Sequence, residues 1–182
     1  MNRIDAAFAR LRAERRSGFI AYLTAGDPSP ALTIPFVRAL EANGADIVEL
    51  GVPFSDPLAD GVVNQRSAER ALRRGVTLKT VLGLVARLRK ESEIPVVLFT
   101  YLNPVYAYGF ERFASDASRA GVDGVLSLDL PPEEASEYEA VLAARGIRTI
   151  FLVAPTTPPA RLRLIAAHAR GFIYCVSRTG VT

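Results

Sequence analysis

The sequence has a single cysteine, Cys175, and a single histidine, His168, among its 182 residues. One thiol excludes an intrachain disulfide, which fits a protein of the reducing cytoplasm. No Cys/His cluster has the spacing of a metal site, so we expect no bound metal. His168 falls in an expected helix away from the strand ends, where a structural or solvent-facing role is expected. Cys175 is expected to be a core thiol.

Long apolar runs are also missing. No run reaches the roughly 18 apolar residues of a membrane-spanning helix, and the N-terminal MNRIDAAFARLRAERR lacks the apolar segment of a signal peptide. We therefore expect a cytoplasmic protein that neither spans a membrane nor is secreted. The net charge of +3 is small and the arginines are scattered, so a nucleic-acid-binding stripe is not expected.

Short apolar strands alternate with amphipathic helical stretches along the whole chain. Hydrophobic residues make up 49% of the sequence, which is enough for a substantial core in one domain. We expect strands at 19–24, 46–50, 95–100, 123–128, 149–153 and 172–176. We expect helices at 2–16, 61–74, 77–92, 110–120, 131–146 and 158–169, and one that ends at Asn43, with Phe36, Val37 and Leu40 inward and a late start or kink at Pro35.

This alternation of strands and helices indicates a parallel sheet covered by helices. An open, doubly wound sheet and a closed barrel both satisfy the pattern. No G-x-G-x-x-G follows the first strand, which weakens the dinucleotide-binding version. In both architectures function collects at the carboxyl ends of the strands, where polar side chains converge on one mouth. Those polar residues include Tyr22, Thr24, Glu49, Thr100, Tyr101, Asn103, Asp129, Thr156, Ser177, Arg178 and Thr179.

Glu49 is an acid inside the apolar stretch DIVEL (46–50). Strand alternation puts Glu49 on the same side as Ile47, opposite Val48 and Leu50. In a barrel one of those sides is the filled interior, where loss of hydration raises the pKa of a glutamate toward the range useful for proton transfer. The alternative is a carboxylate held by a tyrosine or a backbone group for structural reasons only.

Asp56 and Asp60 follow in the loop after this strand. By spacing alone, Asp60 resembles the N-cap of the next helix, and Asp56 before Pro57 resembles a turn residue. Their proximity to Glu49 favours function, because two acids at one mouth can divide the roles of general acid and general base.

VELGVPFSDPLADGVVNQ (48–65) resembles the signature of the tryptophan synthase alpha chain. The similarity continues in FIAYLTAGDP (19–28), TYLNPV (100–105), LDLPPEE (128–134) and YCVSRTGVT (174–182), in the same order along the whole chain. The resemblance implies a (β/α)₈ TIM barrel and a carbon–carbon lyase of tryptophan biosynthesis. Such an enzyme cleaves indole-3-glycerol phosphate to indole and glyceraldehyde 3-phosphate by a retro-aldol reaction. The indole then passes through a tunnel to a beta chain in an alpha2beta2 tetramer.

The resemblance also implies roles for individual residues. Glu49 matches the glutamate that moves protons between the glycerol hydroxyl and indole C3, and Asp60 matches the aspartate at the indole N–H. Thr182 matches the threonine of a mobile loop that closes over the substrate and hydrogen-bonds that aspartate. Residues implied to line the indole pocket or to orient Glu49 are Tyr22, Thr100, Leu126, Asp129 and Tyr174, with Tyr101 close to the same place.

The resemblance further implies that loops 53–57 and 103–108 face the beta chain. The expected cofactor of the complex, pyridoxal phosphate, belongs to that beta chain, and this chain is expected to need none.

The sequence departs from the family pattern at its end. We expect six strands in a single barrel domain over 1–182, whereas a complete barrel has eight, so the last two βα units are expected to be missing from a truncated sequence. No glycine-rich phosphate cradle occurs in 1–182. Two other functions therefore stay open: a non-catalytic activator of the beta chain, and a different sugar-phosphate barrel enzyme such as an isomerase.

Overall fold

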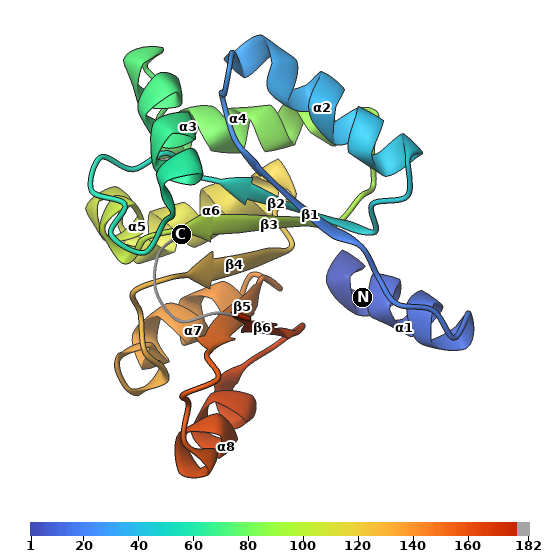
Figure 1. Cartoon of the computed structure of the whole chain (residues 1–182), viewed down its shortest axis with the longest axis vertical. Helices are drawn as coiled ribbons and strands as arrows, with labels where there is room; N and C mark the ends of the chain where they lie inside the picture. Colours follow the sequence, from blue (N-terminus) through green and yellow to red (C-terminus); the bar gives the residue numbers. More distant parts are fainter. Residues whose placement is uncertain (178–182) are drawn as a thin grey trace.

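The computed structural model describes residues 1–177, which form a curled sheet of six parallel strands in the order β1 to β6 (Figure 1). The strands are β1 (Ile20–Thr24), β2 (Ile47–Gly51), β3 (Val96–Thr100), β4 (Gly124–Ser127), β5 (Arg148–Val153) and β6 (Ile173–Cys175). Each strand pairs with the next one along the chain, so the expected parallel βα architecture is confirmed.

Helices connect the strands, and one further helix precedes them. The α-helices are α1 (Arg3–Ala13), α2 (Pro30–Ala42), α3 (Val62–Arg73), α4 (Leu78–Leu88), α5 (Leu102–Tyr108), α6 (Phe110–Ala120), α7 (Ser136–Ala143) and α8 (Pro159–His168), and η1 (Pro132–Glu134) is a 3₁₀-helix. Helix α2 contacts α4, α4 contacts α6 and α6 contacts α7, so these helices follow one another along one side of the sheet. Helix α1 lies apart from them, beside the start of β1 (Figure 1).

The structure corrects the sequence expectations at four places. Helix α2 continues unbroken through Pro35, and Phe36, expected to face inward, is 42% exposed while Val37 is buried. The segment after Tyr101 forms helix α5, which was not expected. The helix expected at 131–146 is divided into η1 and α7. Cys175 is exposed rather than buried, because β6 is the last strand of the described sheet and has only one neighbour.

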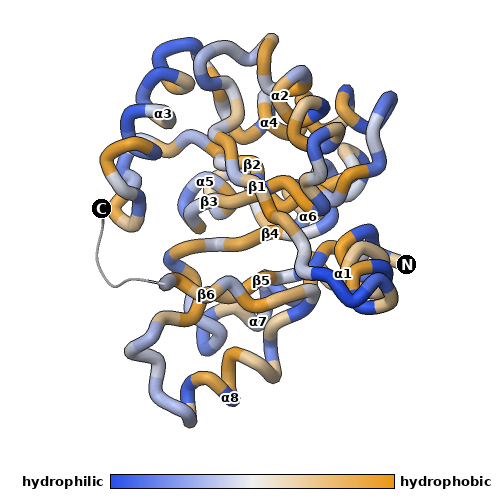
Figure 2. The backbone as a smooth tube through the Cα atoms, turned by 45° about the vertical axis from the view of Figure 1, so that its right-hand side comes forward, coloured by the Kyte–Doolittle hydropathy of each residue, from blue (hydrophilic) through white to orange (hydrophobic). Residues whose placement is uncertain are grey.

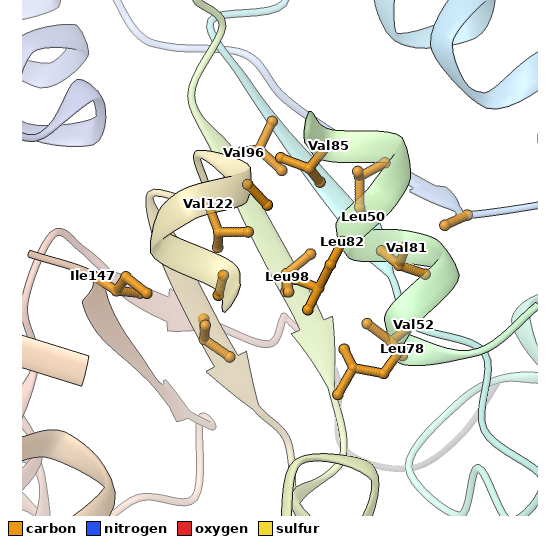
Figure 3. Packing of buried hydrophobic residues seen from close by; sticks show 14 of the residues in the cluster. Leu50, Val52, Leu78, Val81, Leu82, Val85, Val96, Leu98, Val122 and Ile147 are labelled. Atoms are coloured by element: carbon orange, nitrogen blue, oxygen red, sulfur yellow. The ribbon is translucent and has the colours of Figure 1, made fainter. Parts of the chain in front are cut away.

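The outer face of the sheet carries the larger apolar core. In α4, apolar residues recur at the 3- and 4-residue spacing that forms one helix face. Figure 3 shows this face against Leu50 of β2 and Leu98 of β3. The α4 residues of this face are Leu78, Val81, Leu82 and Val85, all buried. The strands are the most apolar segments of the chain, whereas α3 at the periphery is largely hydrophilic (Figure 2).

The inner face of the sheet carries a second, smaller core. Ile4 and Ala7 of α1 pack with apolar side chains from four strands, namely Ile47, Val97, Leu126 and Ile150. Gly124 makes room for this packing, because a Cβ there would lie 2.8 Å from Cδ1 of Ile4. Helix α1 therefore covers the inner face of the sheet on the side of the amino ends of the strands.

Ion pairs fix α1 and its flanking residues to the amino ends of the strands. The carboxylate of Asp46, just before β2, accepts hydrogen bonds from Arg10 at 2.8 Å and from Arg16 at 2.7 Å. Asp123, just before β4, accepts one from Arg3 at 3.2 Å. This end of the sheet is thus built for stability, which leaves the carboxyl ends as the place for chemistry. Among residues 1–177, no helix combines the length and the apolarity that crossing a membrane requires.

Candidate active site

The inner face carries aromatic side chains around one acid at the carboxyl ends of the strands. The parallel register places Tyr22 of β1 beside Glu49 of β2. The ring of Tyr22 lies 5.2 Å from that of Phe99 on β3, and Phe99 lies 6.0 Å from Tyr174 on β6, both edge to face. The curl of the sheet therefore brings its first, third and sixth strands together around Glu49.

Glu49 is a buried acid with an unsatisfied oxygen. Its side chain is on the inner face with Ile47, as strand alternation predicts, and the residue is only 4% exposed. Within residues 1–177, Oε1 of Glu49 has no hydrogen-bond partner. Burial raises the pKa of Glu49 to about 7. A carboxylate with a structural role would have its oxygens bonded, so the geometry favours the functional interpretation.

Asp60 is held by a tertiary contact and does not cap a helix. The N-cap of α3 is Gly61, which has no side-chain capping bond. The hydroxyl of Tyr101 donates to Oδ2 of Asp60 at 2.8 Å. Burial raises the pKa of Asp60, and hydrogen bonds from Tyr101 and Asn64 oppose this rise. Asp60 is therefore a second partly desolvated acid near the same mouth, whereas Asp56 is exposed.

The two acids act on the same two tyrosines. Burial is the main cause that raises the pKa of Tyr22 to about 12, and the negative charges of Asp60 and Glu49 add to it. Burial also raises the pKa of Tyr174, and the same two carboxylates contribute again. Both phenols therefore lie within electrostatic range of both acids, so the structure brings Tyr22, Glu49, Asp60 and Tyr174 together at one place.

Gly51 determines where Tyr22 can lie. A Cβ at Gly51 would lie 2.8 Å from Cζ of Tyr22 and closer still to its hydroxyl oxygen. The missing side chain thus lets the Tyr22 ring lie over the end of β2, with its hydroxyl 3.2 Å from Oγ1 of Thr24.

The other predicted site residues occupy different positions. Leu126 is fully buried in the inner-face core. Thr100 is on the opposite side of β3 from Phe99, and its hydroxyl donates to the Tyr101 carbonyl at 3.1 Å. Asp129 is exposed and accepts a hydrogen bond from the N–H of Leu102, the first residue of α5, at 2.7 Å. Thr182 lies outside the described residues.

Two apolar residues of the inner face, Phe99 and Leu128, are not among the predicted site residues, most of which are polar. Phe99 and Leu128 pack against the inner-face core from β3 and from the end of β4. The signal that could have found them is alternation: Phe99 is two residues after Val97, and Leu128 is two after Leu126. The part of the chain that the structure describes contains no group of three metal-ligating side chains.

Comparison with known proteins identifies relatives over nearly the whole chain. The family model described as "Tryptophan synthase alpha chain" matches residues 8–182. The tryptophan synthase alpha chain of Laribacter hongkongensis is 56% identical over 183 residues, which cover 100% of this chain and 69% of that relative. This chain therefore spans about two thirds of the relative's length.

Solved structures share the fold. Tryptophan synthase subunit alpha from Legionella pneumophila str. Paris superposes with a TM-score of 0.94 at 46% identity, covering 97% of this chain and 68% of that one. A chain from the tryptophan synthase a2b2 complex of Pyrococcus furiosus gives a TM-score of 0.84 at 44% identity, covering 87% of this chain and 64% of that one.

Proposed function

Because this chain belongs to the tryptophan synthase alpha chain family, we propose that Glu49 and Asp60 carry out the retro-aldol cleavage of indole-3-glycerol phosphate. The six parallel strands are then the corresponding part of a (β/α)₈ barrel. The products are indole and glyceraldehyde 3-phosphate, in the pathway to tryptophan. The observation that carries the proposal is the buried carboxylate oxygen of Glu49 on the inner face, which has no hydrogen-bond partner among residues 1–177.

Glu49 moves the protons of the reaction. Indole C3 must first gain a proton, which turns the ring into a good leaving group. The hydroxyl on the adjacent carbon then loses its proton as its C–O bond becomes the aldehyde carbonyl. The electron pair of the broken C–C bond returns to the ring, and C3 keeps its added hydrogen. A carboxyl group with a pKa of about 7 has both protonation states populated near neutral pH, which suits it to donate and to accept.

Asp60 stabilises the charge that this sequence creates. Protonation at C3 leaves positive charge on the ring nitrogen, and a carboxylate beside the N–H stabilises that charge. Partial burial strengthens the interaction because few water molecules screen it. The hydrogen bonds from Tyr101 and Asn64 favour the ionised form of Asp60, which is the form this role requires.

The role of Glu49 is tested with Glu49→Gln, which keeps the shape and removes proton transfer. We expect indole release from indole-3-glycerol phosphate to fall by about 100- to 10,000-fold, the usual contribution of general acid–base catalysis, with an unchanged circular dichroism spectrum. Glu91→Gln, at an exposed glutamate, is the matched control and should retain full turnover. An unchanged rate in Glu49→Gln would refute the role given to Glu49.

We also infer that the chain assembles with a beta chain as an alpha2beta2 tetramer in the cytoplasm. The Pyrococcus furiosus complex supports the assembly, and the single cysteine supports the location. Two large apolar side chains near the predicted interface loops are exposed, Leu58 by 77% and Tyr106 by 70%. Pyridoxal phosphate is assigned to the beta chain, and no cofactor is assigned to this one.

A non-catalytic activator of the beta chain is the second candidate function, and the exposed Leu58 and Tyr106 favour it because they provide a docking surface independent of Glu49. Serine turnover by the beta chain, measured with and without this protein, tests the activation, and indole release from indole-3-glycerol phosphate discriminates the two functions. An activator alone would stimulate that reaction equally well as wild type or as Glu49→Gln, and neither form would release indole.

A further inference from the structure

One phenol holds two consecutive residues of the loop after β2. The Tyr101 hydroxyl donates to Oδ2 of Asp60 at 2.8 Å and accepts from the N–H of Ala59 at 2.9 Å. The bond to the Ala59 N–H fixes the backbone beside Asp60, and the bond to Oδ2 sets how the carboxylate is turned. The Asp60 backbone is also held by a hydrogen bond from its N–H to the Pro57 carbonyl at 3.1 Å and by one from Gln65 Nε2 to its carbonyl at 2.8 Å, so the Tyr101 hydroxyl acts mainly on the orientation of the carboxylate.

Tyr101 is in turn fixed from several sides. It is 5% exposed and directly precedes α5. Its ring lies 5.1 Å from that of Phe54, and its carbonyl accepts the Thr100 hydroxyl. Asp129 accepts from the N–H of the next residue, Leu102, which anchors the start of α5. Phe54 and Thr100 therefore restrain Tyr101 directly, Asp129 restrains it through Leu102, and none of these contacts requires substrate.

We propose that Tyr101 is a positioning residue that orients the Asp60 carboxylate toward the indole N–H and keeps it ionised. This inference rests on the proposed function of Asp60. It gives Tyr101 a role that acts through Asp60, in place of the direct substrate contact that the family resemblance implied.

The surroundings of Asp60 make this hydrogen bond important. The titratable groups within electrostatic range of Asp60 are Tyr22 on β1, Tyr174 on β6 and Tyr101 itself, and Glu49 on β2 acts on the first two of these tyrosines. Among the described residues none of the groups that shift its pKa is basic; only Tyr101 and Asn64 stabilise the negative charge. Loss of the Tyr101 hydroxyl should therefore favour the protonated, inactive form of Asp60.

The test is Tyr101→Phe, with Tyr138→Phe as the matched control. The Tyr138 hydroxyl is hydrogen-bonded to the Ser127 hydroxyl at 3.1 Å, so the control also loses a phenol hydrogen bond, away from the two acids. The ¹³Cγ resonance of Asp60, labelled and assigned by comparison with Asp60→Asn, gives its pKa without any turnover. We expect Tyr101→Phe to raise that pKa by about one unit and to lower kcat by about 10- to 100-fold with little change in KM. Tyr138→Phe should change neither quantity.

The outcomes separate this inference from the proposed function. An Asp60 titration that is the same in Tyr101→Phe and wild type overturns the positioning role. If the titration shifts but Asp60→Asn retains full turnover, the positioning role stands and the function of Asp60 fails. In the Asp60→Asn background, Tyr101→Phe should have no further effect on kcat.

A second measurement covers the case in which Tyr101→Phe does not fold. Uniform replacement of tyrosine by 3-fluorotyrosine makes every phenol a stronger hydrogen-bond donor without removing it. The pKa of Asp60 should then fall below its wild-type value, and an unchanged pKa overturns the proposal.

Discussion

Glu49 has opposite effects on folding and on chemistry. Burial that raises its pKa to about 7 makes it a useful proton carrier, and the same burial makes its ionised form costly in the folded protein. The unfolded chain releases this proton near the ordinary value of 4.5. The stability that Glu49 contributes is therefore fully present below that pH and is lost as pH rises to about 7.

Glu49→Gln should remove this pH dependence. Because glutamine does not ionise, the unfolding free energy of the variant relative to wild type should increase by roughly 3 kcal/mol at most between pH 4.5 and pH 8, the free energy that corresponds to the shift in pKa. Urea unfolding at the two pH values measures this difference. The Glu91→Gln control should show no such change, and an equal absence of change in Glu49→Gln would contradict the burial of the ionised carboxylate.

At the scale of the element, strand β2 ends in Gly51, and the absence of a side chain at this position has a structural role. Gly51 leaves the space in which the Tyr22 ring lies, so the packing of β1 against the end of β2 depends on both residues. This contact sets the position of one of the two tyrosines that face both acids. Adding one methyl group at Gly51 should therefore displace the Tyr22 ring and change the site in this way.

Gly51→Ala should destabilise the protein by about 1–3 kcal/mol, the usual cost of overpacking, and should lower turnover. The double variant with Tyr22→Phe, which lacks the hydroxyl closest to the new methyl group, should lose less than the sum of the two single effects. Chemical denaturation and indole release measure both quantities. If Gly51→Ala matches wild type in both, the Tyr22 ring is not confined as described.

Gly83 provides a control within an element. It lies in α4, and a Cβ there would meet nothing within 4 Å. Gly83→Ala should therefore stabilise the protein by about 0.5–1 kcal/mol through helix propensity alone. A destabilising Gly83→Ala would show that added methyl groups are poorly tolerated in general. The Gly51→Ala result would then no longer indicate a specific contact with Tyr22.

At the scale of the whole molecule, the amino ends of the strands stabilise the fold. Asp46 is 4% exposed and accepts hydrogen bonds from Arg10, Arg16 and the N–H of Phe19. The hydrogen bonds from Arg16, with those from the other donors, hold its pKa well below the usual range. This stabilisation is present above the ordinary pKa of an aspartate and is lost as pH falls toward the lower folded value.

Asp46→Asn should lower the unfolding free energy by about 1–3 kcal/mol at neutral pH without a specific effect on chemistry. The difference in unfolding free energy between Asp46→Asn and wild type should decrease in acid, where the wild-type carboxylate also becomes protonated. Glu69→Gln, which breaks a surface pair with Arg73 whose side chains are 59% and 73% exposed, should cost less than about 1 kcal/mol. Equal losses in the two variants, measured by urea denaturation, would refute a special role for Asp46.

The sequence predicted the sheet because alternation is a local signal. Each strand is a short apolar run and each helix a periodic one, so their order and the shared face of Ile47 and Glu49 follow from spacing. Alternation does not say which face of a strand becomes the interior, and that choice came from the curl of the whole sheet. Helix α5 was not expected because its seven residues are too few for a clear helical periodicity, and Pro104 lies in its first turn, where a proline costs no helical hydrogen bond.

Asp60 shows where spacing misleads. Its position before a helix is typical of an N-cap, but its carboxylate bonds to Tyr101, which is 41 residues away in sequence. Such a contact depends on how two loops meet and has no local signature. Thr100 shows the same limit: it stands at a strand end among functional residues, yet its side chain is on the other side of β3 from Phe99.

The tyrosines around the two acids have a spectroscopic consequence. These 182 residues contain six tyrosines and no tryptophan. Tyr22 and Tyr174 face Glu49 and Asp60, and Tyr101 bonds to Asp60. An indole ring bound among them would accept their excitation energy, and its emission would stand out because no residue of this chain contains the same chromophore. Product capture and departure could therefore be followed in real time by fluorescence, with no label attached.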